Sequence, residues 1–373
     1  MNKIKTYPVN PVHPVKKFCV FASLRERNNM KKVYFKAIDS YSKTQEIRDG
    51  AKELLQKLVD EDHIQLERIV PLKVHFGEKG NKTFIEPKNF EGLIEYLQAQ
   101  RVESCFIETN GLYQGERTTR TKHTQLAKEH GFTQLPIVIA DGEIGDEYAQ
   151  IEINKPHFKT CKIGKAFTQY KQLIVINHFK GHILTGFGGA IKQLAMGCAA
   201  RGGKLDQHSS MRPFINPFKC KKCKTCVRHC PVDAIRIGRF SRIQRKVCIG
   251  CAGCLAVCPA GAILSNPLSS LSRAFPEKVA EYAFAAQKDK TCLYITFALN
   301  MTRQCDCYGR AMKPIVKDLG LFAATDPVAI DQACLDTINK REGKKVFRRG
   351  QYKLDYAQQI GLGSKTYDLI EVN

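Results

Sequence analysis

The cysteine spacing near the middle of the chain constrains its folding more than any other feature of the sequence. The chain has 373 residues and sixteen cysteines, and eight of these form one pattern that occurs twice. Each copy reads C-x₂-C-x₂-C-x₃-C-P, with Cys220, Cys223, Cys226 and Cys230 in the first copy and Cys248, Cys251, Cys254 and Cys258 in the second. The proline that follows each copy prevents the chain from continuing as an uninterrupted helix. Thiols at this spacing predict a compact set of metal ligands.

This run is typical of the bacterial ferredoxins that hold two [4Fe–4S] clusters. Three thiolates two residues apart can bind three corners of one cubane, and the fourth cysteine of each copy then serves the other cluster. We therefore expect Cys220, Cys223, Cys226 and Cys258 to hold one cluster, and Cys248, Cys251, Cys254 and Cys230 to hold the other. Zinc is the main alternative, but zinc usually takes two pairs of ligands separated by a long spacer. A disulfide framework fits less well, because such scaffolds are typically short secreted domains.

Length and hydropathy indicate a cytoplasmic protein of two or three domains. A chain of 373 residues contains enough material for a sizeable core. No uninterrupted apolar run is long enough to span a bilayer, and the apolar stretch at 18–22 is too short for a secretory signal. Clusters bound by thiolates also need a reducing compartment, so we expect the protein in the cytoplasm.

The formal net charge of +23 is large, and basic residues crowd the cysteine-rich segment. These residues are Lys219, Lys221, Lys222, Lys224, Arg228, Arg236, Arg239, Arg242, Arg245 and Lys246. They form either a solvated basic surface or a docking face for an acidic redox partner such as a ferredoxin or flavodoxin, which electrostatic steering favours. Nucleic acid is a less favoured partner, because no nucleic-acid motif or stacking platform is present.

Strands and helices alternate on both sides of the cysteine-rich segment. The expected strands cover residues 33–37, 68–76, 105–108, 136–140, 173–176, 292–299 and 319–323. The expected helices cover residues 45–59, 90–98, 121–130, 279–286 and 327–338, with Asp326 as N-cap and Pro327 as first residue of the last one. This alternation predicts one discontinuous α/β domain, residues 1–212 and 268–373, with residues 213–267 inserted as a ferredoxin-like α+β module. A linear arrangement of three domains is the alternative.

A second candidate site lies between Asn177 and His208. Histidine, lysine and glycine crowd this stretch, and the residues of interest are His178, Lys180, His182, Gly186, Gly188, Gly189, Lys192, Cys198, Arg201, Lys204 and His208. A glycine-rich turn between a strand and a helix can bind an anion through backbone N–H groups, although TGFGGAIK matches neither common nucleotide fingerprint. Ligand sites gather at the carboxyl ends of strands. We therefore predict His182, Lys192 and His208 as catalytic residues and Gly186, Gly188 and Gly189 as cofactor-binding residues.

The chain is similar to a family catalogued as domain of unknown function 362, whose members often carry a bacterial-type ferredoxin module. The resemblance covers nearly the whole chain and rests on VHFGEKGN (74–81), ETNGLYQGERTT (108–119), the stretch 177–209, CDC (305–307) and DLGLFAATDPVAIDQACLD (318–336). It implies an α/β fold and no particular reaction.

His182, the glycine turn, Lys192 and His208 also resemble, more distantly, the signature of lactate racemase-like enzymes. In that family a lysine anchors a nickel-pincer nucleotide, one histidine ligates nickel and others act as acid and base. The spacings of ten residues from His182 to Lys192 and sixteen from Lys192 to His208 fit the pattern. Where the family has a further histidine, this chain has residues 110–113, Asn-Gly-Leu-Tyr. The resemblance therefore implies the fold and the place of the site more strongly than the cofactor.

Cys305 and Cys307 form a separate C-x-C pair. With Cys198 and His208, which the fold can bring near, the pair can bind an additional metal or a third cluster. The alternative is two reduced thiols that ligate nothing. The other cysteines, which are Cys19, Cys105, Cys161, Cys292 and Cys334, are expected to be small apolar core residues.

Together these patterns predict an iron–sulfur electron-transfer protein, either an oxidoreductase or its redox subunit. It would pass electrons between a ferredoxin-like partner and an unknown small-molecule substrate near His182, Lys192 and His208. A non-catalytic metal or iron–sulfur carrier that serves the maturation of another enzyme is the alternative, with Cys305 and Cys307 as the transfer site. A nucleic-acid binder with redox-sensing clusters is a third interpretation, and it requires strongly salt-dependent affinity.

Overall fold

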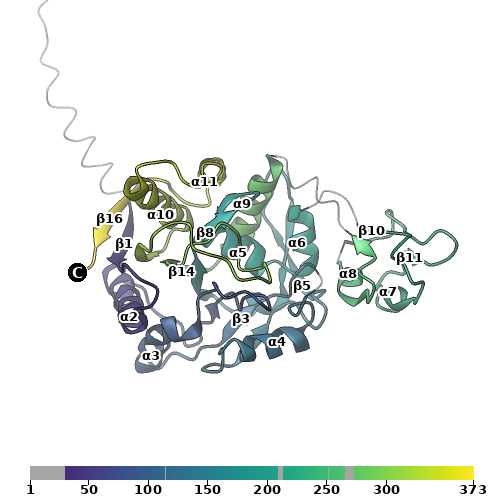
Figure 1. The fold of residues 1–373 in the computed structure, drawn as a ribbon, viewed down its shortest axis with the longest axis horizontal. Helices are drawn as coiled ribbons and strands as arrows, with labels where there is room; N and C mark the ends of the chain where they lie inside the picture. The colour runs from purple at the N-terminus through teal and green to yellow at the C-terminus, as the bar shows by residue number, and fades with distance from the viewer. Residues whose placement is uncertain (1–29, 114, 209–212, 251, 265–272) are drawn as a thin grey trace, which may run out of the picture.

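The computed structural model describes residues 30–113, 115–208, 213–250, 252–264 and 273–373. Its centre is an eight-stranded sheet (Figure 1). The strands are β1 (Lys31–Ala37), β2 (Leu72–Lys73), β3 (Phe106–Glu108), β4 (Ile137–Ile139), β7 (Gln172–His178), β14 (Thr291–Ala298), β15 (Gly320–Ala324) and β16 (Tyr367–Glu371). Their order is β16-β1-β15-β14-β7-β2-β3-β4. Neighbouring strands are parallel except at β15, which runs antiparallel to both β1 and β14.

The middle of the central strands is apolar because both faces of the sheet are buried. In β7, Leu173 and Val175 point into one core and Ile174 and Ile176 into the other. One core is covered by α2 (Thr44–Glu61), α3 (Glu91–Ala99) and α4 (Arg120–Glu129). The opposite core is covered by α5 (Ala190–Cys198), α9 (Ala274–Gln287), α10 (Pro327–Glu342) and α11 (Gly350–Gln359). The result is a three-layer α/β/α domain, in which the two helical layers lie above and below the sheet in Figure 1.

The strand order shows that this domain is discontinuous, as expected. Strands β14 and β15 follow the cysteine-rich segment in sequence, yet they lie between β7 and β1, which precede it. The linear three-domain alternative is therefore wrong, because one sheet contains strands from both sides of the segment. The boundaries at 213 and 267 stay predictions, since residues 209–212 and 265–272 lie outside the described residues.

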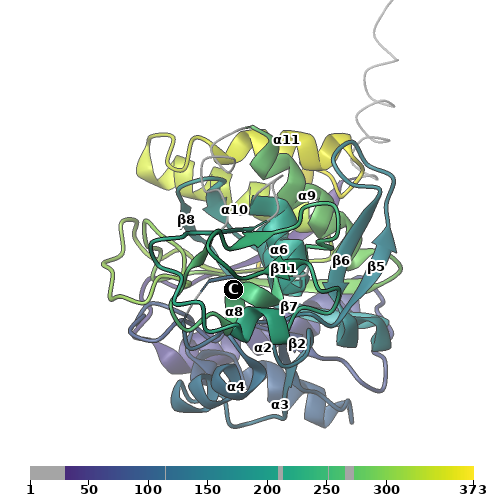
Figure 2. The ribbon, with the colours of Figure 1, turned by 90° about the vertical axis from the view of Figure 1, so that its right-hand side faces the viewer.

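The inserted module is small and has its own core. It consists of α7 (Thr225–Arg228), α8 (Gly253–Val257) and two antiparallel strand pairs, β10 (Phe214–Ile215) with β13 (Ile263–Leu264) and β11 (Ile235–Arg236) with β12 (Arg242–Ile243). Its apolar cluster includes Leu112 and Leu205, which belong to the α/β domain. The backbone carbonyl of Ile249 also accepts a hydrogen bond from Lys162 Nζ at 3.3 Å. The module therefore packs against the α/β domain, and Figure 2 looks onto it from its outer side.

Most of the elements expected from the sequence are present with shifted ends. The largest difference is the strand expected at 68–76, of which only β2, two residues long, is a strand. Pro71 precedes it and has no N–H group to donate to a neighbouring strand. The periodicity did not reveal α11, β16 and the hairpins β5 (Tyr148–Glu152) with β6 (Thr160–Gly164) and β8 (Lys180–His182) with β9 (Gly186–Gly188). In the part of the chain that the structure describes, no helix is both long and apolar enough to cross a membrane.

Helix α10 begins as its sequence predicts. One carboxylate oxygen of Asp326 accepts hydrogen bonds from the N–H groups of Val328 at 2.8 Å and Ala329 at 3.0 Å, and Pro327 is the first helical residue. The other oxygen accepts from Ser364 N at 2.9 Å. The same carboxylate thus caps a helix and holds the loop before β16.

We expect Asp326→Ala to lower the free energy of unfolding by about 1–2 kcal/mol, because it leaves these buried N–H groups without an acceptor. Urea unfolding followed by circular dichroism under anaerobic conditions measures the change. Asp60→Ala, at an exposed position in α2, is the matched control and should change little. Equal destabilisation by the two substitutions would contradict the role of the cap.

Candidate functional site

A cavity of about 910 Å³ lies at the carboxyl ends of the parallel strands. His75 follows β2, Glu108 ends β3, and Lys180 follows β7 on its wall. Cys305 and Cys307 reach the wall from the loop after β14. Loops that follow parallel strands all emerge at the same edge of a sheet, so residues far apart in sequence meet there.

The three residues predicted as catalytic lie on the wall of this cavity. His182 ends β8, Lys192 is in the first turn of α5, and His208 is the last residue of α6 (Arg201–His208). The structure therefore brings all three together with Cys305 and Cys307. Their chemical roles stay predictions.

The glycines of the turn have a structural role that the sequence pattern did not reveal. Gly188 and Gly189 line the cavity, but the N–H groups of Ala190 and Ile191, at the start of α5, donate to buried Asp331 at 2.7 and 3.2 Å. A Cβ atom at Gly189 would lie 2.2 Å from an oxygen of this carboxylate. Helix α5 thus begins on a carboxylate of the chain itself, and these two N–H groups are not free to bind a ligand anion.

Gly186 does not line the cavity and is required for another reason. Its φ of +79° lies in the left-handed region, and an added Cβ atom would lie 2.2 Å from Gly350 N. Both observations favour glycine at this position. The cofactor-binding role predicted for Gly186 therefore has no support from its position.

His182 is arranged as a neutral hydrogen-bond donor. Its Nδ1 accepts from the backbone N–H groups of Leu184 at 3.3 Å and Thr185 at 3.2 Å. Burial, with Lys192 and His208 nearby, lowers the pKa of His182 well below its ordinary value. A neutral ring that accepts at Nδ1 carries its proton on Nε2. To ligate a metal through Nε2, His182 would need its proton on Nδ1, where two N–H groups already point.

The second predicted histidine is also neutral. Burial, with Lys192 and Lys204 nearby, lowers the pKa of His208 to about 3. The ring centroid of His208 lies 4.9 Å from that of Phe275 and 6.0 Å from that of Tyr113. Two neutral imidazoles therefore face the cavity beside lysine side chains.

Two lysines on the cavity wall have pKa values shifted in opposite directions. Burial by itself lowers the pKa of Lys192, but the thiols of Cys305 and Cys307 outweigh it and raise the pKa above its ordinary value. Burial lowers the pKa of Lys204 to about 8. Lys204 Nζ donates to the carbonyl of Ala199 at 2.7 Å and to the hydroxyl of Thr109. Lys192 thus stays cationic at neutral pH, while Lys204 can exchange a proton near it.

Sequence reasoning missed two further residues of the wall, Arg117 and His75. Arg117 Nε lies 3.1 Å from Glu78 Oε2, and one of its terminal nitrogens lies 3.3 Å from His75 Nε2. Both residues belong to stretches that carry the family resemblance, ETNGLYQGERTT and VHFGEKGN. Arg117 follows strand β3 and His75 follows strand β2. A position in the segment that follows a strand of the sheet was the sequence signal that could have identified them as site residues.

Buried charged side chains hold the turn that contains the C-x-C pair. Asp306, between the two cysteines, lies 2.9 Å from Lys180 Nζ and 3.0 Å from His178 Nδ1. Burial by itself raises the pKa of Asp306, but Lys180 and His178 outweigh it and hold the pKa below its ordinary value. Cys305 is buried, whereas Cys307 exposes its side chain to the cavity. The carboxylate therefore holds the turn that carries both thiols.

Cys198 does not join this pair. It is fully buried in the hydrophobic core of the sheet and is not part of the cavity wall. Within the described ranges, no three His, Cys, Asp or Glu side chains converge closely enough to hold a metal ion. A metal or third cluster at Cys305 and Cys307 stays a prediction, and Cys198 is not available as its ligand.

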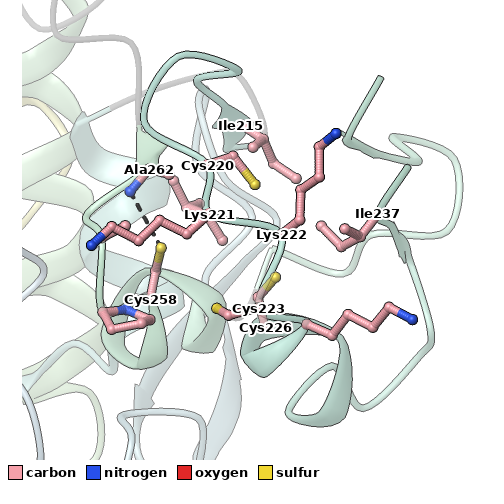
Figure 3. A pocket seen from close by; sticks show the side chains of 13 residues that line it. Ile215, Cys220, Lys221, Lys222, Cys223, Cys226, Ile237, Cys258 and Ala262 are labelled. Atoms are coloured by element: carbon pink, nitrogen blue, oxygen red, sulfur yellow. Dashed lines mark hydrogen bonds between the residues drawn. The ribbon is translucent and has the colours of Figure 1, made fainter. Parts of the chain in front are cut away.

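The module contains a second, small cavity, and four of the predicted cluster ligands line it (Figure 3). They are Cys220, Cys223, Cys226 and Cys258, which is the set expected to hold one cluster. Their side chains surround this shared space. Four thiols around a shared space are a suitable donor set for an iron–sulfur cluster.

Backbone N–H groups support thiolates at both predicted cluster sites. Ala262 N donates to Cys258 Sγ at 3.2 Å, and Ala234 N donates to Cys230 Sγ at 3.2 Å. Of the remaining predicted ligands of the second cluster, Cys248 and Cys254 are partly buried. Cys251 lies outside the described residues. Cys105, Cys161, Cys292 and Cys334 are buried as expected of core residues, and Cys19 lies outside the described residues.

Fold and site together define an α/β protein with a ferredoxin-type module beside a cavity at the carboxyl edge of its sheet. The model of the family described as Domain of unknown function (DUF362) matches residues 70–336. Because the match covers more than half of the chain, the chain belongs to this family.

Shorter similarities concern ferredoxin-like proteins. Over 54 residues the chain is 44% identical to a ferredoxin from Alicyclobacillus acidocaldarius, a match that covers 14% of this chain and 69% of the ferredoxin. Over 45 residues it is 42% identical to one component of the ion-translocating oxidoreductase complex of Methanosarcina acetivorans, covering 12% of this chain and 17% of that component. Over 57 residues it is 39% identical to a pyruvate synthase subunit of Methanocaldococcus jannaschii, covering 14% and 65%. The chain thus spans only a small part of the Methanosarcina component.

Two solved structures are similar in fold. The lactate racemase apoprotein from Thermoanaerobacterium thermosaccharolyticum is 14% identical with a TM-score of 0.37, covering 71% of this chain and 50% of that one. A protein from Thermotoga maritima is 10% identical with a TM-score of 0.40, covering 87% and 60%. At these identities the similarity concerns the fold alone.

We expect Lys204 to be acetylated by acetic anhydride with a half-maximal rate near pH 8, because only the neutral amine reacts and burial lowers its pKa to about 8. Lys192 should react only at higher pH, because the nearby thiols raise its pKa. Peptide mass spectrometry after labelling at a series of pH values measures both rates. Lys204→Arg is the control that identifies the labelled peptide. A midpoint for Lys204 above about pH 10, the range of an ordinary lysine, would contradict the assignment.

Proposed function

We propose that this chain is an iron–sulfur electron-transfer protein that acts as an oxidoreductase, or as the redox subunit of one. It would pass electrons between a ferredoxin-like partner and a small-molecule substrate held near His182, Lys192 and His208. The observation that carries the proposal is the cavity of four cysteines in a module that packs against the wall of the larger cavity. The similarity to ferredoxins and redox subunits supports iron–sulfur electron transfer in general.

The ligands assigned to the two clusters are those expected from the sequence. Cys220, Cys223, Cys226 and Cys258 would hold one cluster, and Cys230, Cys248, Cys251 and Cys254 the other. When bound, [4Fe–4S] clusters supply one-electron transfer at potentials set by their hydrogen bonds and exposure. Thiolate-bound clusters persist in reducing surroundings, so we place the protein in the cytoplasm.

Contact between the module and the cavity wall supports a shared function. Leu112 lines the large cavity and also belongs to the apolar cluster that contains Cys226 and Cys258. Leu205 of α6 joins the same cluster, and α6 ends at His208 on the cavity wall. The module thus packs against a residue of the cavity wall, Leu112, and against the helix that ends at His208.

The side chains of the large cavity can bind and orient a polar substrate. Lys192 and Arg117 provide fixed positive charge, which stabilises negative charge that develops on a bound molecule. His182 presents a hydrogen-bond donor at Nε2, and Lys204 can accept or release a proton near pH 8. These groups together favour a small anionic or carbonyl-containing molecule over an apolar one.

An acidic redox partner is proposed for the exposed basic face of the module. Lys221, Lys222 and Lys224 line the cysteine cavity and are exposed, and Arg228 lies on α7 beside them. Two apolar side chains belong to the same module and are open to solvent, since Phe218 is 97% and Phe240 78% exposed. Positive charge near exposed apolar side chains suits a small acidic protein such as a ferredoxin or flavodoxin.

The second candidate function is a non-catalytic metal or iron–sulfur carrier that serves the maturation of another enzyme. The observation in its favour is Cys307, a thiol open to a large cavity beside a second thiol. Stoichiometric metal transfer without turnover of a small molecule would support this alternative over the oxidoreductase.

We expect an anaerobic preparation to contain about eight iron atoms per chain, since each cubane holds four. Cys223→Ser should lower the iron content and change the EPR spectrum of the reduced protein, because it removes one ligand. Lys192→Ala is the matched contrast: it should leave the iron and the EPR spectrum unchanged and abolish substrate turnover or ligand retention. Two zinc ions and no iron would refute the cluster assignment. Loss of iron in Lys192→Ala would instead show that the two sites are one structural unit.

We also expect reversal of the basic face to slow association with an acidic flavodoxin. Changing Lys221, Lys222, Lys224 and Arg228 to Glu should lower the second-order rate of electron transfer at least about tenfold at low ionic strength, measured by stopped flow. At 1 M salt, where the Debye length is about 3 Å, the difference should nearly vanish. The control variant reverses the four basic residues Lys344, Lys345, Arg348 and Arg349, far from the module in sequence. Equal slowing by both variants would mean that net charge alone, without a docking face, sets the rate.

A further inference from the structure

The C-x-C pair lies in a turn whose geometry suits a disulfide. Tyr308 N donates to the carbonyl of Cys305 at 3.0 Å, which closes a four-residue turn over 305–308. Cys305 and Cys307 are the first and third residues of this turn, so two Cα–Cα steps of about 3.8 Å place their Cα atoms at most about 7.6 Å apart. Disulfides join Cα atoms about 4.4–6.8 Å apart, which lies within that reach. Both cysteines lie on the wall of the same cavity.

The two sulfur atoms of the pair differ in their exposure and in their charged neighbours. Lys192 Nζ donates to Cys305 Sγ at 3.4 Å, and a neighbouring ammonium favours the thiolate form. Cys305 is 3% exposed, while Cys307 opens to the cavity. One sulfur is therefore accessible to a reagent and the other is stabilised as an anion.

The turn is held in place from its other side. Asp306 is fixed by Lys180 and His178, and its carbonyl accepts a hydrogen bond from Glu78 N at 3.2 Å. A turn anchored in this way keeps the two sulfur atoms adjacent in both redox states. The ammonium of Lys192 beside Cys305 also opposes a cationic metal ion at the same sulfur, since like charges repel.

We propose that Cys305 and Cys307 form a redox-active dithiol–disulfide pair that faces the cavity, with Lys192 stabilising the thiolate of Cys305. The proposal goes beyond the proposed function, because it gives the cavity a two-electron group made only of the chain's own side chains. It does not depend on the iron content of the module.

The exchange with a small disulfide such as oxidised glutathione balances as follows. Cys307 passes its proton to the thiolate of Cys305, attacks the reagent as a thiolate and forms a mixed disulfide, which releases one glutathione thiolate. Cys305 gives that proton to the released glutathione, attacks the sulfur of Cys307 and expels the second glutathione, which takes a proton from solvent. One S–S bond forms in the protein and one breaks in the reagent, and two electrons pass to the reagent. In the reverse direction an incoming thiolate attacks Cys307 and expels Cys305, whose stabilised thiolate is a good leaving group.

Tryptic digestion allows the redox state of this cysteine pair to be measured separately from the other cysteines. Arg303 and Arg310 flank it, so trypsin releases residues 304–310, which contain Cys305 and Cys307 and no other cysteine. Anaerobic protein is equilibrated with reduced and oxidised glutathione at a series of ratios, quenched with acid and alkylated. The mass of the peptide then separates the dithiol, the disulfide and the mixed disulfide. The expected result is a reversible conversion with one midpoint.

Variants identify the role of each residue. Cys305→Ser should stop at a mixed disulfide of Cys307 with glutathione, and Cys307→Ser should give no protein disulfide. Lys192→Met removes the cation that stabilises the reduced form, so the equilibrium should move about tenfold towards the disulfide. Lys192→Arg should restore it. Lys79→Met, on the same cavity wall, is the control and should leave the equilibrium unchanged.

Two results would overturn the proposal. One is a peptide that stays fully reduced at every glutathione ratio while the protein remains folded by circular dichroism. The other is a metal bound by the pair, seen as metal lost from both cysteine variants and alkylation of the peptide only after chelation. Iron counting in the same samples reports on the module separately, so failure of this proposal and failure of the proposed function are distinguishable.

Discussion

Burial of both faces of the central sheet is the constraint on which the rest of the structure depends. Helices cover the two faces, so the middle of each central strand is apolar, and polar side chains gather towards the strand ends. Because most of the strands are parallel, their carboxyl ends meet at one edge, and the loops that leave it enclose the large cavity. The antiparallel strand β15 does not disturb this arrangement, since the cavity loops follow β2, β3, β7 and β14.

The polar groups under the cavity are stabilised by pairing. Lys73 bonds to Glu108 beneath the wall, Asp306 lies between Lys180 and His178, and both partners in the first pair are almost fully buried. A buried charge without a partner is costly, whereas a paired and hydrogen-bonded one is tolerated. These pairs hold the loops rigidly and leave other groups, such as Lys192 and Lys204, facing the cavity. The pKa values of these two lysines shift in opposite directions because the thiols of Cys305 and Cys307 raise that of Lys192, whereas burial lowers that of Lys204.

The module is attached where it can serve this cavity. It contacts the α/β domain through Leu112 and Leu205, and both residues belong to segments that also reach the cavity wall. Its exposed basic residues Lys221, Lys222 and Lys224 line the cysteine cavity. This attachment is the basis of the electron-transfer role that we propose.

The sequence by itself determined the local features. The doubled cysteine run identified the candidate ligands, the alternation of strands and helices identified the α/β class, and Asp326 with Pro327 marked the start of α10. Each of these depends on residues close together in the chain. His182, Lys192 and His208 lie within one continuous stretch of sequence, and all three line the large cavity.

Only the tertiary structure decided which distant residues meet. Strand order placed β14 beside β7, which brought Cys305 to Lys192 across more than a hundred residues. It brought His75 and Arg117 to the same wall and left Cys198 in the core. It also assigned the N–H groups at the start of α5 to Asp331, not to a ligand. Local periodicity specifies elements and their buried faces, but the edge at which loops converge depends on how those faces pack, which no single stretch of sequence contains.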